Sequence, residues 1–118
     1  MNWTYLFTGF RGRVARLPFW AGLVLMGLVW LALGIVAVLG NLHLAFDPVH
    51  CALFASLALL SLWPVLAVLA KRWHDRDKSG WWSMLLLVPV IGPLWIFVEL
   101  GMLEGTRGAN QYGPDPLG

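Results

Sequence analysis

The sequence predicts an all-α membrane protein, a small bundle of three transmembrane helices preceded by an interfacial N-terminal segment. Of its 118 residues, 59% are hydrophobic and only 12% are charged, and the mean hydropathy is +0.73. A soluble domain carries about 25% charged residues, because a small fold needs polar surface to cover its core. The charges here gather in short clusters between long apolar runs, so the chain 1–118 is expected to form a single membrane domain.

Two apolar runs are long enough to cross a bilayer. Residues 19–40 contain no charge over 22 positions, which corresponds to about 33 Å of helix against a hydrocarbon core of about 30 Å. Residues 51–70 contain no charge over 20 positions and include Pro64, which is expected to kink the helix. We therefore expect the first two transmembrane helices at about 19–40 and 51–70.

A third apolar run, 81–103, is interrupted at its centre. Pro89, Gly92 and Pro93 fall within five residues, and prolines break or kink helices. Two structures fit this pattern: a kinked third span, or a re-entrant hairpin that returns to its own side of the membrane. Glu99 is the one charge inside the run, and its place near the end of the run favours contact with the interface.

Lysine and arginine are distributed asymmetrically around these runs. Seven of the eight lie in the leader, 1–18, or between the second and third runs, whereas residues 41–50 contain none. Because cytoplasmic loops are enriched in these residues, we expect the N-terminus in the cytoplasm and residues 41–50 outside. The side of the tail, 104–118, depends on whether the third run crosses the membrane.

Hydrophobic residues recur every three or four positions in the leader, at Trp3, Phe7, Phe10, Val14 and Leu17. That spacing is typical of an amphipathic helix that lies flat in the membrane interface with its arginines toward the phosphates. Gly9 and Gly12 weaken such a helix, so an irregular leader held at the surface by its aromatic rings is the alternative.

The loop after the second run is the most densely charged part of the chain. His74 and Asp75 are residue types that bind metals or transfer protons. A metal site needs three or four converging ligands, and the sequence offers no second cluster near this one. Arg72, Arg76 and Lys78 lie next to Asp75 and Asp77 in the sequence, so local ion pairs are the favoured interpretation. We therefore predict no catalytic residue, no metal site and no cofactor.

Five short motifs occur in order along the chain. They are Phe10-x-Gly12-Arg13-x-x-Arg16-x-x-Phe19-Trp20, Arg72-x-His74-Asp75, Ser79-Gly80-Trp81-Trp82, Pro89-x-Ile91-Gly92, and Gly105-x-x-Gly108-x-Asn110-x-Tyr112-Gly113-Pro114-Asp115-Pro116. In this order the chain resembles a bacterial inner-membrane family known as domain of unknown function 805. Pro18 departs from it, because the family often has an acidic residue there. The resemblance implies a multi-pass inner-membrane protein without a settled activity, and suggests that the loop motif and the tail motif act together.

The expected function is that of a structural or interaction protein, not an enzyme, in the bacterial inner membrane. Its basic cytoplasmic face is expected to contact anionic lipid or a protein partner through Arg11, Arg13, Arg16, Lys71, Arg72, Arg76 and Lys78. Small residues in the apolar runs are compatible with a homo-oligomer, and nothing indicates nucleic acid as a partner. The alternative is an oligomeric small transporter or channel, which would need polar groups at membrane depth.

Overall fold

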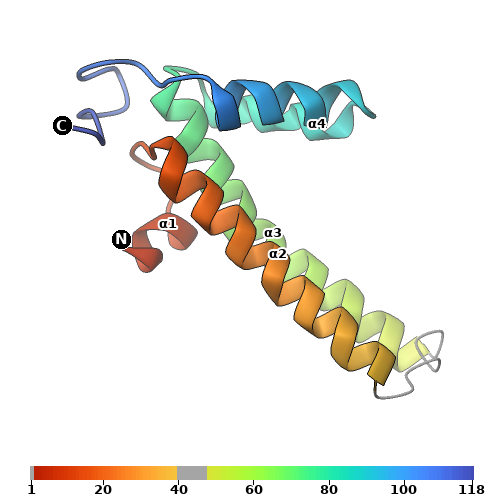
Figure 1. Ribbon diagram of the computed structural model, residues 1–118. Coiled ribbons are helices and arrows are strands. Elements are labelled where there is room, and N and C mark those ends of the chain that lie inside the picture. Colours follow the sequence, from red (N-terminus) through yellow and green to blue (C-terminus); the bar gives the residue numbers. More distant parts are fainter. Residues whose placement is uncertain (1, 40–47) are drawn as a thin grey trace.

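All regular secondary structure in the computed structural model is helical (Figure 1), and the residues described, 2–39 and 48–118, contain no strand. The elements are α1 (Trp3–Thr8), α2 (Arg16–Leu39), α3 (Pro48–Asp75), the 3-10 helix η2 (Gly80–Leu87), α4 (Ile91–Ile96) and the π-helical turn η3 (Phe97–Met102). The predicted all-α class is confirmed.

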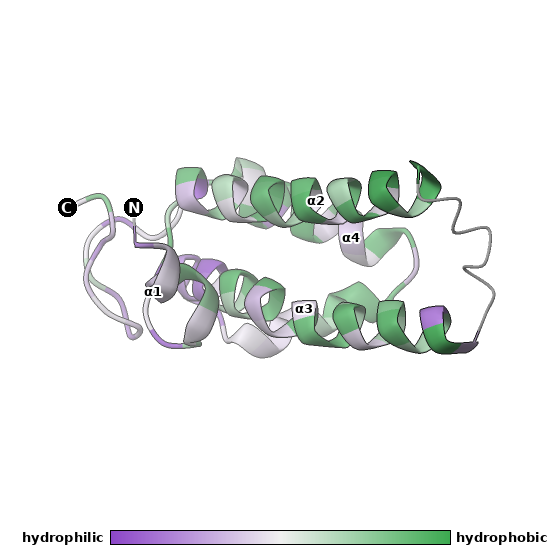
Figure 2. Ribbon diagram, turned by 90° about the horizontal axis from the view of Figure 1, so that it is seen from below, coloured by the Kyte–Doolittle hydropathy of each residue, from purple (hydrophilic) through white to green (hydrophobic). Residues whose placement is uncertain are grey.

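The two long helices, α2 and α3, pack side by side and are long and apolar enough to cross a membrane. Figure 2 shows hydrophobic residues along most of both helices, and many of these side chains are exposed. An apolar helix whose surface is not covered by the rest of the chain needs lipid around it. Long apolar helices are thus present where the first two spans were expected, although α3 continues to Asp75. The expected external loop, 41–50, lies largely outside the described residues.

The third apolar run is not one helix but a hairpin. η2 leads away from the end of α3, and α4 with η3 returns beside it (Figure 1). The 8 residues of η2 rise about 16 Å at 2.0 Å per residue. Residues 91–102 rise about 18 Å if all are taken at 1.5 Å per residue. Neither limb reaches the length of about 30 Å that a span requires, so the three-helix bundle is confirmed only for its two long members.

The tip of the hairpin satisfies its own backbone. The N–H of Ile91 donates to the carbonyl of Pro89 at 2.7 Å, and the N–H of Val88 donates to the carbonyl of Leu85 at 3.0 Å. Val90 lies between Pro89 and Ile91 and has φ 64° and ψ −58°, which is the geometry of the central residue of a γ-turn. Pro89 has no N–H to satisfy, so this irregular turn leaves few polar groups that need water.

The leader forms a much shorter helix than the hydrophobic spacing predicts. Asn2 caps α1 by accepting from the N–H of Tyr5 at 3.0 Å, and the helix ends at Thr8. Beyond Gly9 the chain is irregular, and the N–H of Val14 donates to the carbonyl of Lys71 on α3 at 3.2 Å. The prediction of a continuous interfacial helix through Leu17 was therefore wrong, because the chain bends to pack its second half against α3.

Both ends of the chain lie at the same end of the α2–α3 pair (Figure 1). The tail returns to the end of α3, where the N–H of Thr106 donates to the backbone carbonyl of Asp75 at 2.7 Å. The buried core is concentrated there, and includes Leu6, Val14, Phe19, Val68, Leu69, Trp73, Ile96 and Leu100. The molecule thus has one packed end, and two long helices that extend from it.

Candidate functional site

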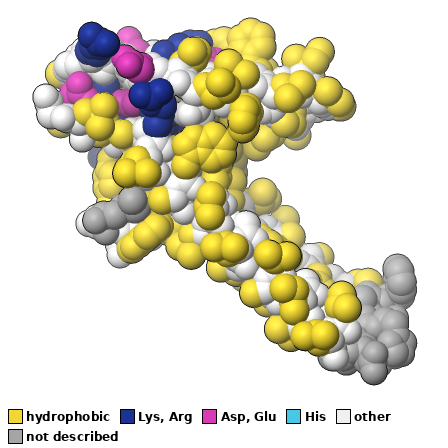
Figure 3. Space-filling model, in the orientation of Figure 1, with side chains coloured by type: hydrophobic (Ala, Val, Ile, Leu, Met, Phe, Trp, Pro, Cys, Tyr) yellow, Lys and Arg dark blue, Asp and Glu magenta, His cyan; other side chains and the backbone are white. Residues whose placement is uncertain are grey.

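The charged side chains gather at the packed end (Figure 3), where the leader, the end of α3 and the tail meet. We call this region the junction and define it by Arg13, Arg72, His74, Asp75 and Asn110. The sequence places Arg13 62 residues before Asp75. Only the antiparallel packing of α2 on α3 brings these two residues together.

Asp75 lies between two arginines. Its Oδ1 accepts from Arg13 Nε at 3.0 Å and lies 2.9 Å from a terminal nitrogen of the same guanidinium, while its Oδ2 pairs with Arg72. The side chains of Arg13, Arg72 and Asp75 are only 1%, 0% and 5% exposed. Removing a charge from water costs several kcal/mol, which is comparable to the whole stability of a domain. These buried charges are therefore stable only if the other N–H groups of both arginines also have hydrogen-bond acceptors.

The remaining arginine donors hold backbone carbonyls from several segments. Arg72 donates to the carbonyls of Leu100 at 2.6 Å and Leu103 at 2.7 Å, at the end of the hairpin. Arg13 donates to the carbonyl of Gly108 at 2.6 Å and also bonds that of Thr106, both in the tail. A guanidinium group carries five N–H donors in a fixed planar geometry. Here the Arg72 guanidinium holds the end of the hairpin, and the Arg13 guanidinium holds the tail.

The tail approaches Asp75 closely because residue 105 has no side chain. A Cβ at Gly105 would overlap the Asp75 carboxylate. Further along, Asn110 and Gly113 exchange backbone hydrogen bonds at 3.0 and 3.1 Å, and Asp115 accepts from the N–H groups of Leu117 and Gly108, each at 2.9 Å. The N–H of Leu117, and next that of Gly108, hold the pKa of the partly exposed Asp115 carboxyl below its ordinary value.

His74 and Asp75 do not form an acid–base pair. His74 Nδ1 lies 2.9 Å from the carbonyl of Gly12, and Tyr112 stacks on the ring with centroids 4.1 Å apart and planes at 4°. Asn110 donates through Nδ2 to the backbone carbonyl of His74 at 2.9 Å. The loop motif and the tail motif therefore meet in space, as the family resemblance suggested, but the contact is one of packing and backbone hydrogen bonds.

The remaining family-motif residues of the loop and tail have local roles. Ser79 caps η2 by accepting from the N–H of Trp81 at 3.3 Å, and the ring of Trp82 lies 5.8 Å from that of Trp73. In the tail, Pro114 follows the turn at Gly113, and Pro116 lines a cavity described below.

Three of the seven cations expected at the lipid surface are buried: Arg13, Lys71 and Arg72. Lys71 donates to the carbonyl of Tyr5 and lies over the Tyr5 ring, 4.4 Å from its centroid. These three side chains are used inside the fold and are not available to headgroups in this structure. Arg11 and Arg16 are exposed, and Arg16 also donates to the carbonyl of Met102 at 2.9 Å.

The other two cations, Arg76 and Lys78, are partly exposed and pair with Glu99. Lys78 bonds Glu99 Oε1, which also lies 3.7 Å from a terminal nitrogen of Arg76, and Trp95 Nε1 donates to Glu99 Oε2 at 2.6 Å. Glu99 is buried within the protein. The expectation that it contacts the membrane interface stays a prediction. The hairpin returns Glu99 to the charged loop, where its charge is balanced.

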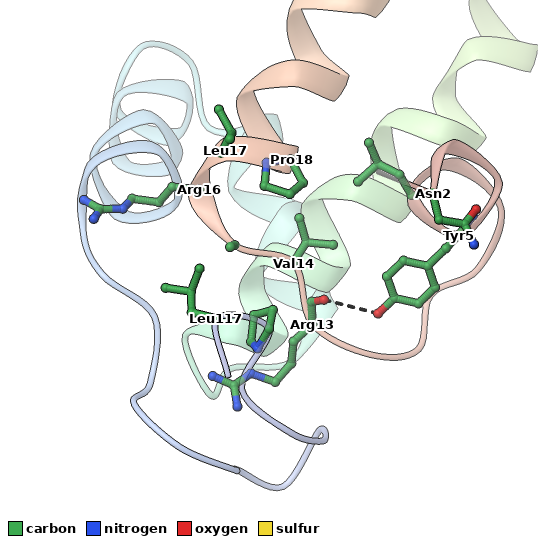
Figure 4. Close-up of a pocket in the computed structure, with 11 residues that line it drawn as sticks. Asn2, Tyr5, Arg13, Val14, Arg16, Leu17, Pro18 and Leu117 are labelled. Carbon is green, nitrogen blue, oxygen red and sulfur yellow. Dashed lines mark hydrogen bonds between the residues drawn. The ribbon is translucent and has the colours of Figure 1, made fainter.

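A cavity of about 480 Å³ lies beside the junction, between α1, the start of α2 and the last residues of the tail (Figure 4). The Tyr5 hydroxyl donates to the carbonyl of Arg13 at 3.2 Å. Figure 4 shows the Arg16 side chain pointing away from Asn2 and Tyr5, and mostly apolar groups such as Val14 and Leu117 line the space. Its charged lining residues are Arg13, which is paired with Asp75, and Arg16.

Among the described residues, no group of three or more His, Cys, Asp or Glu side chains could hold a metal ion. The side chains of the junction hold the leader, α3, the hairpin and the tail together.

A family model described as "Protein of unknown function (DUF805)" matches residues 7–114. The chain belongs to this family. DUF805 relatives include inner membrane protein YhaH of Escherichia coli (strain K12), 35% identical over 111 residues that cover 93% of this chain and 88% of YhaH. Inner membrane protein YhaI of the same strain is also 35% identical, over an alignment that covers 93% of this chain and 87% of YhaI. The uncharacterized protein YiiR of the same strain is 30% identical, over an alignment that covers 90% of this chain and 84% of YiiR.

The first two of these relatives are named as inner-membrane proteins, in agreement with the two long apolar helices. No solved structure matches this chain. Membership of DUF805 therefore supports a bacterial inner-membrane protein and assigns no activity.

Proposed function

We propose that this protein is a structural or interaction protein of the inner membrane and not an enzyme. In this proposal the junction fastens a re-entrant hairpin to the two spanning helices and presents the remaining cations to anionic lipid. One observation carries it: Asp75 and its two buried arginines are fully engaged with one another and with backbone carbonyls. A group bound in this way is poorly suited to proton transfer, but it holds three segments in one position.

The proposal includes a topology with both termini in the cytoplasm. Two spans bring the chain back to its starting side, and the short limbs of the hairpin dip into the bilayer and return. The excess of Lys and Arg at the junction supports the cytoplasmic assignment. Green fluorescent protein fused after Gly118 should fluoresce, and alkaline phosphatase fused there should be inactive. The opposite pair of results would overturn this topology.

Exposed arginines at the packed end support the lipid contact. Arg11 and Arg107 are exposed, and the only partner of Arg107 among the described contacts is the exposed Glu104, at 3.2 Å. A surface pair of this kind contributes at most about 1 kcal/mol, so Arg107 can exchange Glu104 for a phosphate. Each basic residue near an anionic membrane surface contributes about 1 kcal/mol to the attraction.

The test measures lipid preference with the native tryptophans. Protein is reconstituted with phosphatidylglycerol or phosphatidylcholine carrying brominated chains, which quench tryptophan, and the relative affinity for the anionic lipid is determined. We expect a preference for phosphatidylglycerol that weakens with salt and falls several-fold in Arg11→Gln/Arg107→Gln. The matched Arg11→Lys/Arg107→Lys variant keeps the charge and should keep the preference. Equal affinity for both lipids in the wild type would refute the contact.

An oligomeric transporter or channel has less support. The hydroxyls of Ser56 and Ser61 donate to carbonyls of their own helix at 2.8 Å, and Glu99 is already paired. The donors of both serines are thus used within α3 and the charge of Glu99 is balanced, so these groups give little support to a pathway through the membrane. Homo-oligomerisation stays a prediction.

A further inference from the structure

A second, larger cavity of about 650 Å³ lies between α3 and η2, away from the cavity beside α1. One wall is a stripe of α3 formed by Leu62, Leu66, Ala70 and His74. These residues are spaced by four, so they share one helix face over about 18 Å. The other wall is η2, from Gly80 to Leu87. We call this cavity the groove.

The two walls are closest near Gly80, which belongs to the family-motif loop. A Cβ built there would lie 2.9 Å from the Cβ of Ala70, so only glycine allows η2 to lie this close to α3. Farther along, the hairpin extends away from the long helices (Figure 1). The groove thus runs along α3 from the packed end into the apolar part of the molecule.

The lining of the groove is uncharged and has polar groups mainly toward one end. Apart from His74, its polar side chains are Ser79, Ser83 and the indole of Trp81, and no Lys, Arg, Asp or Glu of the described residues lines it. Leu62 and Leu66 continue the wall into the span, where the surrounding solvent is hydrocarbon. The arrangement fits a molecule with an apolar chain and an uncharged polar head, and it offers nothing to balance the charge of a phosphate.

Two polar atoms of this lining lack a partner among the described residues. Ser83 is only 9% exposed, and its Oγ is buried without a hydrogen bond. His74 donates through Nδ1 to the carbonyl of Gly12, because a carbonyl only accepts, so Nε2 of the neutral ring carries a lone pair. Nε2 faces Gly80, since a Cβ there would lie 3.8 Å from it. The groove therefore offers an acceptor at His74, whereas the Ser83 hydroxyl lies beneath its surface.

We propose that the groove binds an acylglycerol, a lipid with a hydrocarbon chain, an ester carbonyl and a free hydroxyl but no phosphate. The chain lies along Leu62 and Leu66, and the lipid hydroxyl donates to His74 Nε2, the one acceptor identified above in the groove. This site does not depend on the anionic-lipid contact, which uses exposed arginines outside the groove.

The test uses full-length protein in nanodiscs and a dioleoylglycerol probe with a photoreactive diazirine on one chain. A phosphatidylglycerol carrying the same chain is the comparison, and labelled peptides are mapped by mass spectrometry. We expect the acylglycerol to label residues 62–87 about fivefold more than the phosphatidylglycerol does. A fivefold difference in affinity corresponds to about 1 kcal/mol, the contribution of one hydrogen bond of ordinary strength. His74→Phe, which keeps an aromatic ring against Tyr112 but has no ring nitrogen, should bring this ratio toward one.

Leu62→Trp should fill the groove and abolish the excess labelling, whereas Leu59→Trp, on an exposed residue of the same helix that does not line the groove, should leave it unchanged. Equal labelling by the two lipids in the wild type would overturn the proposal. Labelling that persists in Leu62→Trp would also overturn it.

Discussion

Replacing Asp75 by asparagine is the sharpest test of the junction. The carboxylate neutralises two guanidinium groups whose side chains are 1% and 0% exposed, and it is itself 5% exposed. The amide introduced by Asp75→Asn would keep the shape and one acceptor oxygen, but it would leave Arg13 and Arg72 buried without a counter-charge. Removing one partner of a buried pair costs about 3–5 kcal/mol, whereas exposed pairs contribute about 0–1 kcal/mol.

We expect Asp75→Asn to lower the free energy of unfolding by about 3 kcal/mol, the low end of that range, because one acceptor is retained. That loss corresponds to a change of roughly 100-fold in the unfolding equilibrium. Reversible unfolding in dodecylmaltoside with increasing mole fractions of sodium dodecyl sulfate, followed by tryptophan fluorescence, measures it. Hydrogen exchange of residues 104–118 should accelerate at the same time, because Arg13 also holds the carbonyl of Gly108.

Asp77→Asn is the matched control. Asp77 carries the same charge two residues away, but it is exposed and has φ 59°, a conformation that asparagine adopts readily. We expect a change within about 0.5 kcal/mol. If Asp75→Asn proves as stable as Asp77→Asn and its tail exchanges as slowly as in the wild type, the buried ion pairs do not fasten the tail.

Two further substitutions test how the hairpin is held. Gly101→Ala should destabilise the protein by about 1–3 kcal/mol in the same unfolding assay, because the added Cβ would overlap the ring of Trp20; Gly27→Ala, which meets no atom within 4 Å, should be neutral or stabilising. Glu99→Gln should cost about 1–3 kcal/mol and increase hydrogen exchange across residues 91–102, because Lys78 loses its charged partner; unchanged exchange would show that this pair does not hold the hairpin.

The two spanning helices could be predicted because burial in lipid depends on each residue's own side chain. Twenty or more consecutive uncharged residues favour a helix in the bilayer whatever the rest of the chain does. The leader was harder to predict. Its hydrophobic spacing fits a helix to Leu17, but the N–H of Val14 finds a better partner in the carbonyl of Lys71 once α3 is alongside. Tertiary contact overrode the local pattern.

The third apolar run shows why the sequence left two possibilities open. Pro89 and Pro93 indicate a break, but both a kinked span and a hairpin contain one. The structure distinguishes them through contacts far apart in the chain. Trp20 donates through Nε1 to the carbonyl of Gly101 at 2.9 Å, and Arg72 donates to that of Leu100. These contacts require the second limb to return to the packed end.

The cations of the candidate site also show which features the sequence predicts and which depend on the tertiary structure. A count of Lys and Arg predicts which end of the molecule is charged, but not which charges are free. Arg13 and Arg72 look like surface residues in the sequence, and the fold buries both against Asp75. The family resemblance indicated that loop and tail act together, and the stacking of Tyr112 on His74 gives that indication a physical form.

The sequence by itself determined the membrane class, the two long helices and the charged end, because the cost of placing a residue in hydrocarbon is local and nearly additive. The tertiary structure decided the path of the hairpin, the return of the tail and the pairing of the buried charges. Those features depend on residues up to 100 positions apart, such as Arg13 and Gly113. A hydrogen bond or ion pair of that kind has no signature in either residue alone, since it exists only when packing brings both partners out of water together.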